Sequence, residues 1–365
     1  MNLSDKKELT DNEISDYIKD LSNDNTETRI EASQILSKNN ILKAIQPLVD
    51  QLNIETDKEV RRRIISALGR LKAKDALHLI IEILLRESDR DTRWSAAYTL
   101  GEIGSKDAVK PLLDVCKTDS SSIVRTWSAL ALSKIKDETI VLDLIQLLEN
   151  EIDGLVRWGI VVALRKIGSK EAGKAIVKAL ENDKFKDTRQ EAARAIGEMK
   201  IPDTEDILAK VLEKEQEIDV IRNIVYALGE LNTNRSCEIL ISTIRNSVND
   251  WARAEAVEMI GMTSLSNKEE FLFQILKNDE FVYARANAAN ALGGLEISDK
   301  LDEIIDMLIL SFKDKSLQVR IRAVLALGNI GPKAEKAIPA LEEIKYTNEK
   351  LTKAVRYAMK KITKI

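Results

Sequence analysis

The residues best suited to catalysis are scarce in this sequence and lie far apart. His78 is the single histidine, and Cys116 and Cys237 are the two cysteines. Each cysteine lies within an apolar helical stretch, which predicts two reduced thiols in the core rather than a disulfide. The sequence has no glycine-rich phosphate-binding loop. We therefore expect no catalytic residue, no metal site and no cofactor, and we expect that the chain is not an enzyme.

Carboxylates are abundant, but no two of them stand out as a catalytic pair. Glu102, Glu198 and Glu230 recur at one register, which is typical of a solvated surface of mixed charge. The 56 basic and 60 acidic residues give a formal charge of −4, so the whole chain has no net attraction for nucleic acid or anionic membranes. Residues 1–10 are polar, and no window of about 18 apolar residues follows, which predicts a cytoplasmic protein without a membrane segment.

One residue type recurs with strict spacing. An arginine, numbered here as position zero, recurs every 32 residues through the first nine positions, counting Ile221, and then after 35 and 36 residues. Leucine or isoleucine is the usual residue at position +7, and glycine is frequent at +8. So many copies of one arginine indicate a structural role, because catalysis needs one site. The zero arginines are Arg29, Arg61, Arg93, Arg125, Arg157, Arg189, Arg253, Arg285, Arg320 and Arg356.

Each zero arginine lies in a stretch with the periodicity of an amphipathic helix. At about 100° per residue, positions −1, +3, +4, +7 and +10 fall on one apolar face. A second apolar helical stretch precedes each arginine helix, and Pro47, Pro111 and Pro339 lie in the first turn of three of these stretches. Aromatic residues make up only 4% of the chain, which favours helix over sheet. The sequence therefore predicts an all-α fold of about eleven antiparallel helix pairs.

One such pair cannot bury both of its apolar faces, so the pairs must stack. Small residues at +3 and glycine at +8 let neighbouring pairs approach closely. We expect a single solenoid over residues 11–365 behind a polar tail of residues 1–10. The polar terminal helices over residues 11–21 and 350–365 favour a monomer. The longer repeats after Gly293 predict a change of curvature near residues 294–318.

Several zero positions follow an acidic residue within one turn, as at Asp57, Asp89, Asp153, Asp187 and Asp219. This proximity predicts a ladder of charge-assisted hydrogen bonds between repeats. Ile221 breaks the series, and we expect Arg222 to replace the missing arginine imperfectly. A weaker junction is predicted there.

The segment from Val156 to Gly168 shows the repeat clearly, with a Val-Arg start and a Leu near its end; its relatives include residues 92–104, 188–199 and 319–331. The pattern resembles the HEAT repeat family, in particular the HEAT-like repeats named after phycobilisome lyases, from about residue 12 to the C-terminus. The resemblance implies an α-α superhelix in which the arginine helices line the concave side. It implies much less about function, because one fold serves many functions.

Some proteins with such repeats are enzymes. Deoxyhypusine hydroxylase binds two irons through His-Glu pairs on several repeats, but His78 of this chain is followed by Leu79, so that set cannot be assembled. His78 is predicted to be a surface or flanking residue. Bilin lyases remain an alternative, because they have no short motif to test in this sequence.

Positions +1, +2, +5 and +9 point away from the core, toward the implied concave face. Exposed aromatic side chains are typical anchors of protein interfaces. We therefore predict a groove for a protein or peptide partner, centred on repeats three to seven. The alternative is that each ring lies flat against the next repeat and only extends the core. The candidate residues are Trp94, Tyr98, Trp127, Trp158, Arg194, Tyr226, Asn287 and Asn290.

Nucleic acid is the second class of partner to consider, because some HEAT-like proteins are DNA glycosylases that hold duplex on a basic concave surface. The run Arg61 to Arg63, with Arg194, Arg222 and Arg322, would contribute to such a surface. Acidic residues share this face, for example Glu31, Glu191 and Glu255, so its potential is predicted to be mixed. The sequence favours a protein partner over nucleic acid.

Overall fold

The computed structural model describes residues 9–295, 299–344 and 348–364, and every regular element in these ranges is a helix. The all-α fold of stacked helix pairs is confirmed. Residues 1–8 of the predicted tail, and residues 296–298 of the segment predicted to change the curvature, lie outside the described residues. The chain divides into two compact units, which are described separately. The single continuous solenoid stays a prediction.

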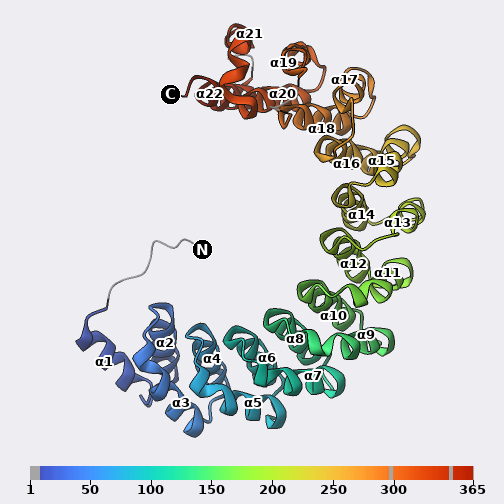
Figure 1. The fold of residues 1–365 in the computed structure, drawn as a ribbon. Coiled ribbons are helices and arrows are strands. Elements are labelled where there is room, and N and C mark those ends of the chain that lie inside the picture. Colours follow the sequence, from blue (N-terminus) through green and yellow to red (C-terminus); the bar gives the residue numbers. More distant parts are fainter. Residues whose placement is uncertain (1–8, 296–298, 345–347, 365) are drawn as a thin grey trace. The chain divides into compact units, whose positions relative to one another are not determined.

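Unit 1 comprises residues 1–179 and 183–188. Its arginine helices pack side by side and form the inner layer, and the other helix of each pair lies outside them (Figure 1). The inner layer holds α2 (Thr26–Lys38), α4 (Lys58–Arg70), α6 (Arg90–Ile103), α8 (Ser122–Ile135) and α10 (Gly154–Ile167). The remaining helices are α1 (Asp11–Asp20), α3 (Ile45–Ile54), α5 (Leu77–Arg86), α7 (Val109–Thr118) and α9 (Val141–Asn150).

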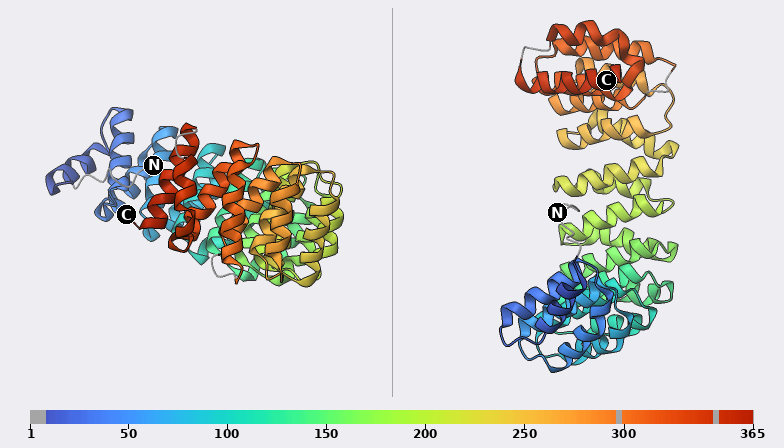
Figure 2. Two further views of the ribbon diagram at one scale, coloured as in Figure 1. Left: turned by 90° about the horizontal axis from the view of Figure 1, so that it is seen from above. Right: turned by 90° about the vertical axis from the view of Figure 1, so that its left-hand side faces the viewer.

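Unit 2 comprises residues 180–182 and 189–365, and the division falls within α11 (Gly173–Asn182) and α12 (Lys186–Met199). Its successive pairs lie one above the next (Figure 2). The arginine-register helices are α14 (Ile218–Leu231), α16 (Asp250–Met262), α18 (Val282–Gly293), α20 (Leu317–Ile330) and α22 (Glu349–Thr363). Their partners are α13 (Glu205–Leu212), α15 (Asn234–Asn246), α17 (Lys268–Asn278), α19 (Leu301–Leu310) and α21 (Ile338–Ile344).

The helix boundaries follow from local sequence. The side chains of Asp57 and Asp153 accept hydrogen bonds from the first free N–H groups of α4 and α10. α6 and α10 end at Gly104 and Gly168, whose φ angles of 71° and 81° are readily adopted by glycine. Short 3₁₀ turns, such as Lys106–Ala108, lead into the first helix of most pairs.

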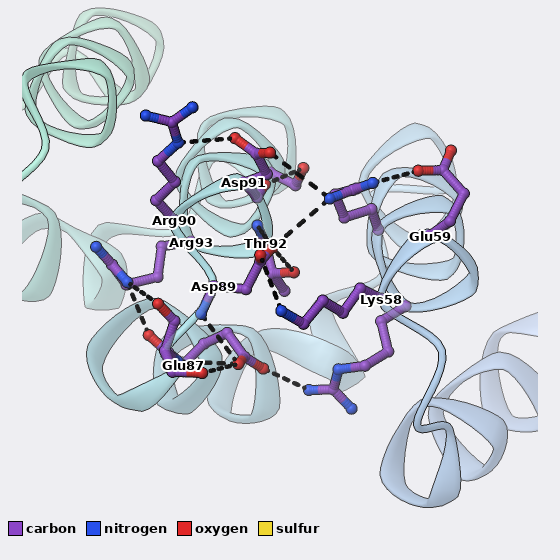
Figure 3. A network of polar contacts seen from close by, with 12 residues as sticks. Lys58, Glu59, Glu87, Asp89, Arg90, Asp91, Thr92 and Arg93 are labelled. Atoms are coloured by element: carbon purple, nitrogen blue, oxygen red, sulfur yellow. Dashed lines mark hydrogen bonds and ion pairs between the residues drawn. The ribbon is translucent and has the colours of Figure 1, made fainter.

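The arginine ladder is present, but with other acids than the sequence predicted. Arg93 donates from Nε and Nη2 to the Asp119 carboxylate, at 2.8 and 3.1 Å, and from Nη1 to the main-chain oxygen of Glu87 at 2.9 Å. The main-chain oxygen of Asp119 in turn accepts a hydrogen bond from Nη1 of Arg125 at 2.8 Å. Asp119 therefore joins the arginines of two successive repeats, and it lies 26 residues after the first of them. The network around Glu87 and Arg93 is shown in Figure 3.

The same pairing recurs along both units. Burial alone would raise the pKa of Glu55, but hydrogen bonds from Arg29, the Asp57 N–H and Gln51 outweigh burial and hold this pKa below its usual value. The other pairs are Arg29–Glu55, Arg61–Glu87, Arg125–Glu151, Arg157–Asp183, Arg189–Glu215, Arg253–Asp279 and Arg285–Asp314.

The acids named from the sequence have a different function. Asp57, Asp89 and Asp153 cap the N-termini of their helices, because each begins a helix and its carboxylate meets the free N–H groups there. The prediction that they pair with the zero arginines was wrong. Asp219 lies beside Arg222, 3.8 Å away.

One rung of the ladder lacks both partners. Ile221 replaces the arginine and is fully buried, and Ser247 occupies the position of the acid 26 residues later. Arg222 does not take over this rung, since it bonds Glu255 on α16 at 2.8 Å. The weaker junction predicted here stays a prediction.

Candidate functional site

Three of the predicted aromatic residues meet on the inner layer of unit 1. Trp94 of α6 and Trp127 of α8 stack, with ring centroids 5.5 Å apart and an interplanar angle of 28°. Tyr98 meets Trp127 edge to face at 5.6 Å. These three rings are called the aromatic cluster below. Trp158 lies on α10, the next helix of the layer.

The helices bring these rings together for local reasons. Trp94 and Tyr98 are four residues apart and therefore lie on one face of α6. A Cβ atom on Gly101 of α6 would lie 2.9 Å from the Cα atom of Ala131 on α8, so only glycine permits the observed approach. Close packing of α6 on α8 then sets the ring of Trp127 against those of α6.

The rings have features of both alternatives considered from the sequence, an exposed binding surface and an extension of the core. Trp94, Tyr98, Trp127 and Trp158 are all half-buried. Each ring of the cluster contacts a ring of the neighbouring repeat, as the core-extending alternative requires. Each also keeps part of its surface open to solvent, as a binding surface requires. Lys134 lies over the Tyr98 ring at 4.3 Å.

The remaining predicted residues belong to unit 2, and they make polar contacts. Arg194 on α12 is exposed and bonds Glu198 at 2.7 Å. Tyr226 on α14 is half-buried; burial and the Glu230 carboxylate raise its pKa. Like any tyrosine hydroxyl at neutral pH, this group is protonated and is available as a hydrogen-bond donor.

The two predicted asparagines link α18 to α16. The Asn287 side-chain amide donates to the main-chain oxygen of Ala254 at 2.8 Å, and Asn290 donates to Glu258 at 3.4 Å. Both side chains are half-buried. Their hydrogen bonds give them a packing role within unit 2.

A second group of rings was missed by the sequence reasoning. Trp251 lies 4.8 Å from Tyr283 and 5.8 Å from Phe281, at the N-terminal ends of α16 and α18. The guanidinium groups of Arg222 and Arg253 each lie 5.9 Å from a ring of this group. A signal was available, because Trp251 and Tyr283 both precede their zero arginine by two residues.

The described residues offer little for catalysis. Among them, no group of three or more His, Cys, Asp or Glu side chains is placed to hold a metal ion. His78 is exposed on α5, as predicted. Cys116 is buried with a free thiol, and burial, together with the Glu151 charge, raises its pKa to about 12. This thiol is therefore a poor nucleophile. None of the helices in the described ranges combines the length and the apolar composition that a membrane span requires.

Comparison with known families agrees with the geometry. Residues 45–133, 173–261 and 269–360 match the family of HEAT repeats. The chain belongs to the HEAT repeat family. Residues 156–182 also match the PBS lyase HEAT-like repeat, the type indicated by the sequence. None of the curated proteins compared with this HEAT-repeat chain matches it.

Solved structures share the fold at low sequence identity. Importin beta is 15% identical, with a TM-score of 0.62 over 96% of this chain and 55% of its own. Kap95p, in a structure with RanGDP, is 14% identical, with a TM-score of 0.60 over 97% and 58%. Kap121p, bound to the extreme C-terminus of Cdc14p, is 12% identical, with a TM-score of 0.53 over 97% and 50%. This HEAT-repeat chain thus spans between half and three fifths of these proteins.

Proposed function

We propose that this HEAT-repeat chain is a non-enzymatic scaffold that holds a protein or peptide partner on the inner layer of unit 1. The observation that carries the proposal is the set of half-buried rings on three successive helices, α6, α8 and α10. Aromatic side chains that keep one part packed and another part open are well suited to anchor a partner, because little side-chain entropy is lost on binding.

The comparisons support a protein partner. Kap121p, which shares the fold, is bound to a segment of Cdc14p in one structure and to Nup53p in another. The identity is low, so the likeness to this chain concerns the fold. We further propose that the chain acts as a monomer in the cytoplasm and binds no membrane.

Site-specific photo-crosslinking tests where the partner lies. Benzoylphenylalanine is placed at the half-buried Leu130, three residues after Trp127 on α8, or at Leu142, which is 70% exposed on the outer helix α9. After irradiation in extract of the native cells, we expect a crosslinked protein from the Leu130 position and none of the same mass from Leu142. A partner crosslinked from Leu142 alone would place the binding surface on the outer helices instead.

A variant experiment tests the rings themselves. The triple variant Trp94→Ala, Trp127→Ala and Trp158→Ala is compared with Leu142→Ala, after circular dichroism shows equal helicity. We expect the triple variant to lose the crosslinked partner and the Leu142 variant to retain it. Equal retention by both would refute the proposal for these rings.

A further inference from the structure

A row of charged side chains runs beside the aromatic cluster. Position +9 of α2, α4, α6, α8 and α10 holds, in order, Lys38, Arg70, Glu102, Lys134 and Lys166, and these five residues are called the +9 row. The five helices pack side by side, so the row crosses the inner layer of unit 1. Its one carboxylate, Glu102, forms an ion pair with Lys134. The row therefore carries a net positive charge.

The +9 row adjoins the rings. Position +9 lies one helical turn beyond position +5, where Tyr98 is found, and both face the same side of their helix. Lys134 belongs to the +9 row and also contacts the aromatic cluster, since its Nζ atom lies 4.3 Å from the Tyr98 ring centroid. A ligand that contacts the rings would therefore also reach the row.

Three cations of the row are available to a ligand. Lys38, Arg70 and Lys166 are exposed, and within the described ranges none of them forms an ion pair or a hydrogen bond with another side chain. The zero arginines differ, because their guanidinium groups are committed to the ladder.

The helix dipole does not account for the row. Basic residues in the last turn of a helix interact favourably with its negative end. However, the same register holds Glu198 on α12 and Glu230 on α14, in the C-terminal turns of helices of the same kind. The surplus of cations is thus a property of unit 1 and not of the repeat.

We propose that the inner layer of unit 1 binds an extended peptide segment in which acidic residues are interspersed with bulky apolar residues. This inference rests on the proposed function and specifies its partner. Carboxylates of the segment pair with the +9 row, while its apolar side chains contact the aromatic cluster and Trp158. Packed helices lie about 8–10 Å apart, and an extended chain advances about 3.3 Å per residue. One helix therefore corresponds to about three residues. Carboxylates opposite Lys38 and Arg70 are expected about three residues apart, and a carboxylate opposite Lys166 about nine residues beyond the one at Arg70.

The ring contacts favour a peptide over single-stranded nucleic acid. Proteins that bind single strands stack bases on free aromatic faces. Here Trp94 and Trp127 stack on each other, and Lys134 covers a face of Tyr98. One face of each of these three rings is therefore already covered, which leaves fewer faces for base stacking.

Selection from a displayed library of random 16-residue peptides tests the inference on the full chain. Three variants are compared with the intact protein. The first carries Arg70→Glu and Lys166→Glu. The second carries Lys110→Glu and Lys174→Glu on the outer helices α7 and α11, where both lysines are exposed, and has the same change in net charge. The third carries Trp127→Ala and Trp158→Ala.

We expect peptides selected on the intact chain to combine Asp or Glu with Leu, Phe or Trp at the stated spacing. Their Kd is expected to rise about tenfold or more with the inner charge reversal and to stay unchanged with the outer one. Peptides without surplus acid, peptides that bind both charge variants equally, or the absence of any enriched peptide would overturn the inference. If binding is lost only in the tryptophan variant, the proposed function stands and the acidic specificity fails.

A fluorescein-labelled 15-nucleotide oligouridine is titrated in parallel. We expect no binding at the protein concentration that saturates the selected peptides. Tight binding that the inner charge reversal abolishes would assign the +9 row to single-stranded nucleic acid and overturn the inference.

Discussion

Replacing Arg285 by Met tests the arginine ladder where it is most deeply buried. Arg285 is 4% exposed and donates four hydrogen bonds, two to the Asp314 carboxylate and two to the main-chain oxygens of Asp279 and Glu280, at 2.8 to 3.1 Å. Methionine has a similar length and keeps much of the packing. It supplies no donor, so the partly buried Asp314 carboxylate retains only its bond from the Ser316 N–H, at 2.7 Å.

The expected cost follows from burial. Removing one partner of a buried, hydrogen-bonded ion pair typically costs about 3–5 kcal/mol, and Asp314 retains some solvent contact, so we expect about 3 kcal/mol. Arg222→Met is the matched control. Its pair with Glu255 also joins successive repeats at 2.8 Å, but the Arg222 side chain is 47% exposed. Exposed pairs contribute about 0–1 kcal/mol, so we expect a loss of about 1 kcal/mol or less.

Hydrogen exchange measured by mass spectrometry reports the local cost on α18 and α20 for Arg285→Met and on α14 and α16 for Arg222→Met, even where unfolding of stacked repeats is not two-state. Adding Asp314→Leu to Arg285→Met is expected to recover part of the loss, because no unpaired carboxylate remains. If Arg285→Met costs no more than Arg222→Met, the ladder is not a main source of stability and the reasoning fails.

Three further predictions concern the same framework. Ile221→Arg alone and Ser247→Asp alone are each expected to leave the free energy of unfolding unchanged or to lower it. In the double variant, urea denaturation is expected to show a favourable coupling energy of about 1–2 kcal/mol between the two substitutions, since together they restore the missing rung. Additive effects of the two substitutions would contradict this prediction. Gly101→Ala is expected to lower the free energy of unfolding by about 1–3 kcal/mol in the same assay, because the new methyl group meets Ala131 at the helix crossing. An unchanged midpoint of urea denaturation would show that the two helices move apart freely. The free energy of unfolding is expected to fall between pH 7 and pH 3. A carboxyl group whose pKa is lower in the folded state, such as Glu55, stabilises the fold above its unfolded-state pKa of about 4.3, and this contribution is lost as the pH falls through the folded-state pKa. A flat pH profile would contradict this prediction.

The fold could be predicted from the sequence because one register repeats nearly without error. The 32-residue spacing of the arginines identifies equivalent positions in every pair, and the glycine at +8 marks the helix contact that Gly101 makes with Ala131. The ladder partners were harder to predict. Their acids lie 26 or 29 residues away, and they are Asp in some repeats and Glu in others. Asp57 and Asp89 lie much nearer to their arginines in the sequence, but these two residues cap helices.

The candidate site could be predicted only in outline. The register places Trp94 and Trp127 on the same face of neighbouring helices, but the stacking of their rings depends on how closely α6 and α8 approach. Asn287 shows a different difficulty. An outward asparagine can serve a partner or the adjacent helix, and its sequence position does not distinguish the main-chain oxygen of Ala254 from a ligand atom.

The division of the basic residues into two classes also limits where binding can occur. An arginine at position zero is the most regular cation of the chain, and its repetition indicates a structural role. Arg93 and Arg125 direct their donors to Asp119, Glu151 and the loops that join the helices, so little of their charge is left for a partner. Irregular cations such as Arg70 and Lys166 have no such commitment. In a repeat protein the residues that every copy shares hold the stack together, and specificity must come from positions where the copies differ.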